Sequence, residues 1–269
     1  MIQTQSRRPQ LIDSHCHLNY DYSPKTLEEI LSEAHQAGVS HLVTIGTDIE
    51  SIAKVQEISQ TYEKVFHTIG VHPHDVHALA ESDLGKLRGA ARHPKCRAIG
   101  EIGLDYHYDH SPRDQQIHWL NLQLDLALEL NLPIVIHSRE GEDDLLVALS
   151  RYAALIPSGS IPGIIHCFSG TPEFGLKCIE LGFYISFSGI LTFKKADEIR
   201  TAAQAYPLER ILIETDSPYL APIPHRGKKC EPSMVALTAH KLAEIKGLPF
   251  ETVAEVTTKN AKRIFKIAE

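Results

Sequence analysis

The chain has 269 residues, of which 43% are hydrophobic, and a formal net charge of −7 at pH 7. That acidic balance argues against a protein that coats nucleic acid non-specifically, although an enzyme could still hold a few phosphates locally. The five cysteines contain no C-x-x-C pair, which argues against a disulfide framework or a cysteine zinc cluster.

The beginning of the chain, MIQTQSRRPQ, lacks the apolar core of a secretion signal. No stretch approaches the roughly 18 consecutive apolar residues that a membrane span requires. We therefore expect a cytoplasmic protein that makes no contact with a membrane, and we infer no obligate protein partner.

Short apolar runs alternate with longer segments of helical periodicity along the whole chain. Segments such as TLEEILSEAHQAG repeat apolar residues every three or four positions, which is typical of a helix packed on one side. Eight strand–helix units are the pattern of an α/β protein of the (β/α)₈ TIM barrel type, and we expect residues 1–269 to form one such domain. The expected strands cover residues 11–18, 41–47, 65–73, 97–105, 133–139, 163–170, 183–189 and 211–219.

An open, doubly wound sheet is the alternative architecture, because it also alternates strands and helices. It would collect functional residues at one switch point fed by two or three strands, whereas a barrel collects them from the ends of many strands. Two further helical segments, 231–246 and 250–266, follow the eighth run. We expect the last helix of the barrel and an extra helix that packs on the outside.

The first run ends in two histidines, His15 and His17, separated by one residue. Alternate side chains of a strand point to the same side, so the two imidazoles should lie side by side. Ser14 and Cys16 should then both face the other way. This spacing predicts a common partner for the two imidazoles.

Polar residues recur near the C-terminal end of five of the eight runs. An apolar residue at each position would favour folding more, because an unpaired buried polar group costs about 1–3 kcal/mol of stability. A shared ligand explains the repetition, and contributions from five runs favour the barrel over the open sheet. The six residues are His15, His17, Glu101, His137, His166 and Asp216.

Imidazole and carboxylate groups together are ligands for Zn²⁺, Mn²⁺ or Fe²⁺, and carboxylates also suit Mg²⁺. Six ligands exceed the three that a catalytic zinc ion usually takes from the protein. They fit two divalent ions per chain, about 3.5–4 Å apart, with a carboxylate between them. Two such ions outweigh the charge of two carboxylates, so the site would favour an anionic substrate. The sequence leaves the choice among Zn, Mg and Mn open.

Other polar residues near the strand ends each have two interpretations. The segment HPHDVH, residues 72–77, is either a solvated loop or an element that contacts the substrate, with His72 as the strongest candidate. Glu214 shares the parity of Asp216 and is either a supporting acid or a catalyst.

Several of these segments together resemble the TatD family of metal-dependent deoxyribonucleases. They occur in the family's order and spacing and cover essentially the whole chain: DSHCHL, GEIGLDY, IHSR, HCFSG and ETDSPYLAP followed by RGKKCEP. The resemblance implies a TIM barrel of the amidohydrolase, metal-dependent hydrolase type. It also implies that one metal ion binds to His15, His17 and Asp216, that the other binds to His137 and His166, and that Glu101 bridges both.

Two positions of this chain carry a residue that differs from related patterns. Glu101 stands where many relatives outside the family have a carboxylated lysine at the end of the fourth strand. Cys230 stands where the family pattern has asparagine, and we assign it no role.

The expected reaction is hydrolysis of a phosphodiester by a water molecule that the two ions activate, with Asp216 as proton acceptor and Glu101 setting the spacing of the ions. The resemblance implies a 3′→5′ exonuclease that acts on single-stranded DNA or DNA ends, with RNA left open as a second polymer. The candidate donors to the phosphate are His72, Arg139, Ser169 and Arg226.

Two other functions remain open from the sequence. The same activated water would also hydrolyse another ester or an amide, such as an aminoacyl-tRNA ester or a small cyclic amide. A non-catalytic barrel that keeps metal for stability is the other alternative. It predicts that at least one ligand is missing, and all six are present.

Overall fold

The computed structural model describes residues 9–268 of the chain. Most of the N-terminal segment that we expect to carry no secretion signal, residues 1–8, lies outside the described residues. Between residues 9 and 268, no helix is both long and apolar enough to cross a bilayer. All five cysteines fall in this part of the chain, and each is free.

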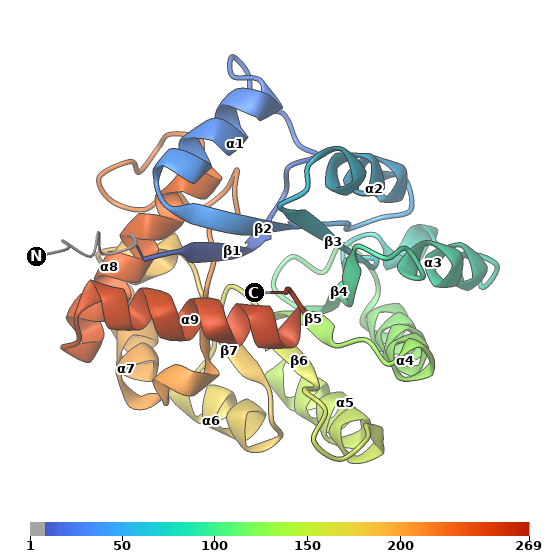
Figure 1. Ribbon diagram of the computed structural model, residues 1–269. Coiled ribbons are helices and arrows are strands. Elements are labelled where there is room, and N and C mark those ends of the chain that lie inside the picture. Colours follow the sequence, from blue (N-terminus) through green and yellow to red (C-terminus); the bar gives the residue numbers. More distant parts are fainter. Residues whose placement is uncertain (1–8, 269) are drawn as a thin grey trace, which may run out of the picture.

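Eight parallel strands follow one another in chain order around a nearly closed barrel (Figure 1). The first and last strands meet through a single bridge between Cys16 and Ser217. The structure therefore has the (β/α)₈ architecture that the eight runs predict, and the open doubly wound sheet is excluded, because its strands would not follow chain order. The strands are β1 (Leu11–Cys16), β2 (Val39–Ile45), β3 (Val65–Ile69), β4 (Cys96–Asp105), β5 (Ile134–Arg139), β6 (Gly163–Ile165), β7 (Tyr184–Phe187) and β8 (Ile211–Ile213).

The helices surround this barrel, and the first of them shows how the sequence sets their ends. Thr26 Oγ1 accepts from the backbone N–H of Glu29, while the Glu29 carboxylate accepts from the backbone N–H of Thr26, which is a capping box. The α-helices are α1 (Leu27–Gln36), α2 (Ser51–Thr61), α3 (Asp83–Ala91), α4 (Arg113–Leu130), α5 (Glu142–Leu155), α6 (Pro172–Glu180), α7 (Asp197–Ala205), α8 (Val235–Lys246) and α9 (Phe250–Ile264). Short 3₁₀ turns are η1 (Val76–Ala78), η2 (Gly189–Thr192), η3 (Leu208–Arg210) and η4 (Pro232–Met234).

Helix α9, drawn in red in Figure 1, lies across one end of the barrel. An inner apolar core combines residues from all eight strands with Ile264 and Phe265 at the end of this helix. Asn260 fixes the helix there, because its amide donates to the carbonyls of Leu208 and Ile211 at 3.0 and 2.9 Å. The expectation that the extra helix packs on the outside is therefore wrong. The barrel interior leaves apolar side chains at its N-terminal end, and an amphipathic helix buries them.

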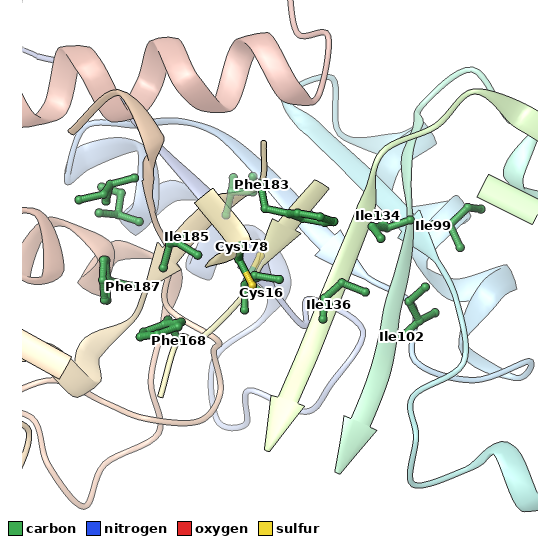
Figure 2. Packing of buried hydrophobic residues seen from close by; sticks show 14 of the residues in the cluster. Cys16, Ile99, Ile102, Ile134, Ile136, Phe168, Cys178, Phe183, Ile185 and Phe187 are labelled. Atoms are coloured by element: carbon green, nitrogen blue, oxygen red, sulfur yellow. The ribbon is translucent and has the colours of Figure 1, made fainter. Parts of the chain in front are cut away.

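A larger apolar cluster fills the layer between the strands and the surrounding helices. Figure 2 shows Ile99 and Ile102 of β4 beside Ile134 and Ile136 of β5 in this outer cluster. The two layers of core are what a barrel wrapped by helices requires, since each strand buries both of its faces.

The alternation of inward and outward side chains along strand β4 is interrupted near Glu101. Ala98 belongs to the inner core, so strict alternation would turn Ile102 inward as well. The register with β5 is interrupted between Ile99 and Ile102, and Ile102 lies in the outer cluster. Such an irregularity re-aims one side chain, and here that side chain is Glu101, which faces into the barrel.

Strand β1 carries a similar interruption, between Asp13 and Cys16. Ser14 Oγ lies 3.2 Å from Ser186 Oγ of β7, whereas Cys16 donates to the carbonyl of Val43 and belongs to the outer cluster. The expectation that Ser14 and Cys16 share one face is wrong, because the strand does not alternate regularly through this stretch.

Candidate metal centre and active site

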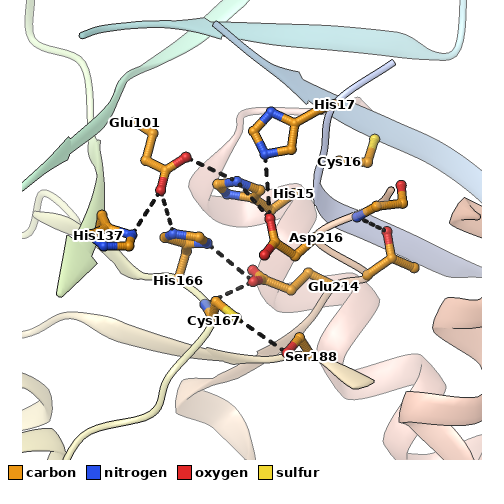
Figure 3. A network of polar contacts seen from close by, with 12 residues as sticks. His15, Cys16, His17, Glu101, His137, His166, Cys167, Ser188, Glu214 and Asp216 are labelled. Carbon is orange, nitrogen blue, oxygen red and sulfur yellow. Dashed lines mark hydrogen bonds and ion pairs between the residues drawn. The ribbon is translucent and has the colours of Figure 1, made fainter. Parts of the chain in front are cut away.

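The ends of the first and last strands are fastened together where the paired histidines lie. The backbone N–H of Asp216 donates to the carbonyl of His15 at 2.9 Å, and that of His17 donates to the carbonyl of Ser217 at 2.8 Å. These bonds join segments about 200 residues apart in the chain and bring the Asp216 carboxylate beside both imidazoles. The six residues singled out from the sequence all lie at this end of the barrel, and Figure 3 shows them converging.

Glu101 stands at the centre of the group. One carboxylate oxygen, Oε2, lies 3.4 Å from His15 Nε2. The other, Oε1, lies 2.7 Å from His166 Nε2, 3.1 Å from His137 Nδ1 and 3.4 Å from His72 Nε2. The two oxygens of one carboxylate thus face two different sets of imidazoles, which is the arrangement a bridging ligand needs.

On the side of the first strand, Asp216 completes the set. Its Oδ1 lies 3.3 Å from His17 Nε2 and 3.6 Å from His15 Nε2. Ligand atoms of His15, His17 and Glu101 lie within 4.8 Å of one another, and so do those of His72, Glu101 and His137. A third set, His15, His166 and Glu214, also lies within this distance. Glu101 belongs to the first two sets, which mark two adjacent places for a cation among the described residues.

Buried nitrogen atoms without hydrogen-bond partners test whether these residues fit a metal. Both ring nitrogens of His15 are buried and have no hydrogen-bond partner among residues 9–268. The same holds for His166 Nε2, although it lies 2.7 Å from a carboxylate oxygen, because the geometry is not that of a hydrogen bond. Leaving such atoms unpaired would cost about 1–3 kcal/mol each. Nitrogen and oxygen lone pairs that converge in this way fit a divalent cation.

The charges of the site follow from this crowding. Burial alone would raise the pKa of Glu101, but the facing imidazoles, His166 first, hold it well below its usual value. Burial likewise opposes ionisation of Asp216, and the neighbouring histidines nevertheless lower its pKa. Burial lowers the pKa of His15, which favours the neutral form that a metal ligand requires. The site therefore presents two carboxylates that are ionised at neutral pH.

Asp105, at the end of β4, is a member of the site that the sequence analysis missed. Its Oδ2 accepts from His74 Nε2 at 2.9 Å and from His137 Nε2 at 3.0 Å. Its Oδ1 accepts from the backbone N–H groups of His107 and Tyr108. Because His137 Nε2 is engaged with Asp105, its Nδ1 is left to face Glu101. The signal was present, since Asp105 is a polar residue at a strand end like the other six.

Glu214 has a comparable place behind His166. Its Oε1 lies 3.2 Å from His166 Nδ1 and accepts from the backbone N–H of Cys167 at 2.8 Å. Of the two interpretations open from the sequence, the geometry matches a supporting acid, because Glu214 is fully buried and holds the far side of an imidazole. A carboxylate thus stands behind each of His137 and His166.

The residues predicted to contact substrate fall in different places. A cleft of about 1250 Å³ opens above the metal centre, and His72, Arg139 and Ser169 are among its lining residues. His72 also approaches Glu101 closely enough to be a ligand rather than only a donor to substrate. Arg226 does not line the cleft, because its guanidinium stacks on the ring of Phe193 at 3.8 Å. Phe193, by contrast, is one of the lining residues.

The charge on the cleft wall is mostly negative. Arg139 is the only lysine or arginine among the described residues that line it, and its guanidinium lies 5.2 Å from the ring centre of Tyr108. The loops after β3 and β5 and the first turn of α5 contribute carboxylates, namely Asp75, Glu140, Glu142, Asp143 and Asp144. An extended polyanion would be repelled by this wall, whereas a short chain end can reach the floor.

Known proteins share this architecture along nearly the whole chain. The family model described as TatD related DNase matches residues 12–266. The uncharacterized metal-dependent hydrolase YabD of Bacillus subtilis is 41% identical over 257 residues, which cover 96% of this chain and 99% of YabD. The uncharacterized metal-dependent hydrolase YcfH of Escherichia coli K12 is 38% identical over 260 residues, which cover 96% of each chain.

Among solved structures, the crystal structure of YjjV, a TatD homologue from Escherichia coli K12, superposes with a TM-score of 0.90. The sequences are 29% identical, and the match covers 97% of this chain and 99% of YjjV. With a family match that spans the barrel and a centre of histidines and carboxylates that fits divalent cations, this chain belongs to the TatD family and is a metal-dependent hydrolase.

Proposed function

We propose that this hydrolase is a deoxyribonuclease, a 3′→5′ exonuclease that cleaves phosphodiester bonds of single-stranded DNA, with RNA as a second polymer to be tested. The observation that carries the proposal is the position of Glu101, whose two oxygens face two sets of imidazoles at the floor of an open cleft. Enzymes that catalyse displacement at phosphorus commonly use two divalent ions about 3.5–4 Å apart. The description of the matching family, TatD related DNase, supports the same substrate class.

The side chains of the site have different roles in the proposed reaction. Metal ions bound here would supply positive charge that polarises the phosphodiester and activates water. Asp216 is ionised, and 15% of its side chain is exposed to the cleft, so it can accept a proton from a water molecule at the floor. Glu101 is buried behind it and keeps the two sets of imidazoles at a fixed separation. Arg139 and Ser169 stand on the wall where they can donate to phosphate oxygens.

The electrostatics of the cleft favour the end of a strand over its middle. Among the described residues that line the cleft, Arg139 alone is a lysine or arginine, while five carboxylates stand on the loops after β3 and β5 and on the first turn of α5. Long-range attraction of a polyanion is therefore weak. A single terminal phosphodiester gains the attraction of the metal centre and avoids most of the repulsion, which supports an exonuclease.

The test uses metal-stripped protein reconstituted separately with Mg²⁺, Mn²⁺ and Zn²⁺. Single-stranded DNA carrying a label at either the 3′ or the 5′ end, and RNA of the same sequence, are digested in parallel. We expect early release of labelled mononucleotide only from the 3′-labelled strands. Glu101→Ala should abolish release, and His118→Asn, which removes an exposed histidine away from the cleft, should leave it unchanged.

The proposal fails if neither label is released with any metal while the protein still binds two ions per chain. A panel of other esters and amides would then identify the substrate of the same metal centre. Early release from only the 5′-labelled strand would keep the nuclease and reverse the polarity.

A further inference from the structure

The cleft above the metal centre has two chemically different sides. The loops after β3, β4 and β5 line it with acids and histidines. Across the barrel, the loops after β7 and β8 and the start of α7 line it with large apolar side chains. We call this second side the apolar wall, and it consists of Ile190, Phe193, Ile199, Tyr219 and Leu220, with Glu198 as the charged residue at its edge.

The apolar wall is held firmly by contacts between its two loops. Gly189 lies so close to the carbonyl of Leu220 that a side chain at position 189 would collide with it. Thr192 Oγ1 accepts from the backbone N–H of Ile223 at 2.9 Å. Arg200 adds two hydrogen bonds, to the carbonyls of Leu191 and Phe193, at 3.1 and 2.7 Å. The wall is therefore a preformed surface rather than a loose loop.

Tyr219 is the most exposed aromatic side chain of this wall and the nearest to the metal centre. It follows Asp216 by three residues, and its backbone N–H donates to the Asp216 carbonyl at 2.9 Å. The ring stands nearly perpendicular to those of His17 and Tyr20, with centres 6.1 Å apart in both cases. With 53% of its surface exposed, Tyr219 offers an aromatic face to the cleft.

Arg226 strengthens the wall from behind. Its guanidinium lies over one face of the Phe193 ring, 3.8 Å from the ring centre, and Arg226 does not line the cleft whereas Phe193 does. Flat aromatic side chains stack on any nucleobase, because every base has a π face. On the acidic side of the cleft, Tyr108 lies under Arg139, and this arginine itself lines the cleft, unlike Arg226.

We infer that the apolar wall is a nucleobase subsite, which binds the base of the nucleotide whose phosphate lies at Glu101 and Asp216. The inference rests on the proposed function, because it takes a nucleotide phosphate as the group held at the metal centre. It goes further in naming the surface that recognises the base. Since stacking has no hydrogen-bond pattern to read, the subsite accepts all four bases.

The experiment compares two ligands that share a phosphate and differ in the base. Metal-loaded protein is titrated calorimetrically with deoxyadenosine 5′-monophosphate and with 2-deoxyribose 5-phosphate. In the wild type we expect the nucleotide to bind about tenfold or more tightly than the sugar phosphate, as base stacking on aromatic residues predicts. Tyr219→Ala and Phe193→Ala should bring the ratio of the two dissociation constants close to one. Tyr219→Trp, which keeps a stacking ring, should preserve the ratio.

Tyr108→Ala is the matched comparison, because Tyr108 is also 53% exposed and lines the same cleft on its acidic side. It should leave the ratio as in the wild type. A wild-type ratio near one, a ratio that survives Tyr219→Ala, or no measurable binding of the nucleotide overturns the inference. These readouts involve no DNA cleavage, so a protein that binds the base but releases no nucleotide refutes the proposed nuclease and leaves the subsite standing.

Discussion

His137 Nε2 lies 3.0 Å from Asp105 Oδ2, and this bond decides which nitrogen of His137 faces the metal centre. Burial alone would raise the pKa of Asp105, but the hydrogen bonds from His137 and His74 hold it well below its usual value. An ionised carboxylate at this position keeps the proton on His137 Nε2 and leaves the lone pair on Nδ1. Outer carboxylates of this kind orient metal-binding histidines and raise their basicity.

Asp105→Asn should therefore weaken metal binding without disturbing the ligands themselves. We expect the affinity for Zn²⁺ to fall about 10- to 100-fold, and Asp105→Ala to lower it at least as much. Titration of metal-free protein in competition with a chelating dye measures the change. Asp125→Asn, which removes an exposed carboxylate paired with Arg151, is the control and should bind as the wild type does. Unchanged affinity in Asp105→Asn would show that the tautomer of His137 is set by something else.

Metal binding should also stabilise the fold, because the ligands come from five different strands or strand ends. We expect divalent metal at about 100 times its dissociation constant to raise the free energy of unfolding by about 2.7 kcal/mol. Chelator should reverse the gain. In Glu101→Ala most of the gain should be lost, since both sets of imidazoles share that carboxylate. His118→Asn should keep it, and urea unfolding with and without metal gives the comparison. Equal gains in the two variants would contradict a shared ligand at Glu101.

Strands β4 and β5 lie very close together beside the metal centre, so replacing a glycine there should change the free energy of unfolding much more than replacing a glycine elsewhere. A side chain at Gly103 would collide with the carbonyl oxygen of His137, on backbone that cannot move aside, and Gly103 has a φ of +150°. Gly103→Ala should therefore lower the free energy of unfolding by about 3 kcal/mol or more. Gly85 lies in helix α3 with nothing near its missing side chain. Gly85→Ala should raise stability by about 0.5–1 kcal/mol.

Urea unfolding followed by circular dichroism tests this pair, with metal absent so that binding does not mask the change. If the free energy of unfolding of Gly103→Ala lies within about 1 kcal/mol of the wild-type value, β4 and β5 do have room for a side chain at position 103, because a collision with fixed backbone would cost more than this.

That the polar residues of the site lie together could be predicted from the sequence, because the topology of a parallel barrel alone brings the ends of its strands together. His15 and His17 precede Asp216 by about 200 residues, yet in a barrel of parallel strands the C-terminal ends of all strands form one rim. The place of each residue in that rim followed from counting strands. The same counting could not foresee how Glu101 turns inward, since this depends on an interrupted register between Ile99 and Ile102.

What the sequence did not reveal depends on contacts between distant loops. In the sequence Arg226 belongs to a basic loop and has no evident partner. In the structure its guanidinium lies over the ring of Phe193, which follows β7. Asp105 is a polar residue at a strand end, but only the folded chain shows that it lies between His74 and His137. Helix α9 had a recognisable period, yet its apolar face covers the open end of the barrel and not its side. Periodicity identifies the buried face of a helix and says nothing of what covers it.

His67 on β3 gives the barrel a sensitivity to acid that is separate from the metal centre. The imidazole is fully buried, with Nδ1 2.8 Å from Ser59 Oγ. Burial, followed by the charges of His93 and Arg97, lowers the pKa of His67 to about 3. An unfolded chain would take up this proton near pH 6.5. Between pH 6.5 and pH 3 the unfolded state therefore binds more protons than the folded state, and stability falls as the pH falls through that window.

We expect this single group to remove about 2 kcal/mol of stability between pH 6.5 and pH 4.5. His67→Asn keeps a polar atom near Ser59 but cannot titrate, so its loss of stability over the same range should be smaller than that of the wild type by this amount. Its free energy of unfolding at pH 6.5 should be lower than that of the wild type, because the smaller side chain leaves a cavity. Urea unfolding at pH 6.5, 5.5 and 4.5, with chelator throughout, measures the slopes. His118→Asn, the exposed histidine, should parallel the wild type, and a His67→Asn curve that is also parallel would show that His67 does not stay neutral in the fold.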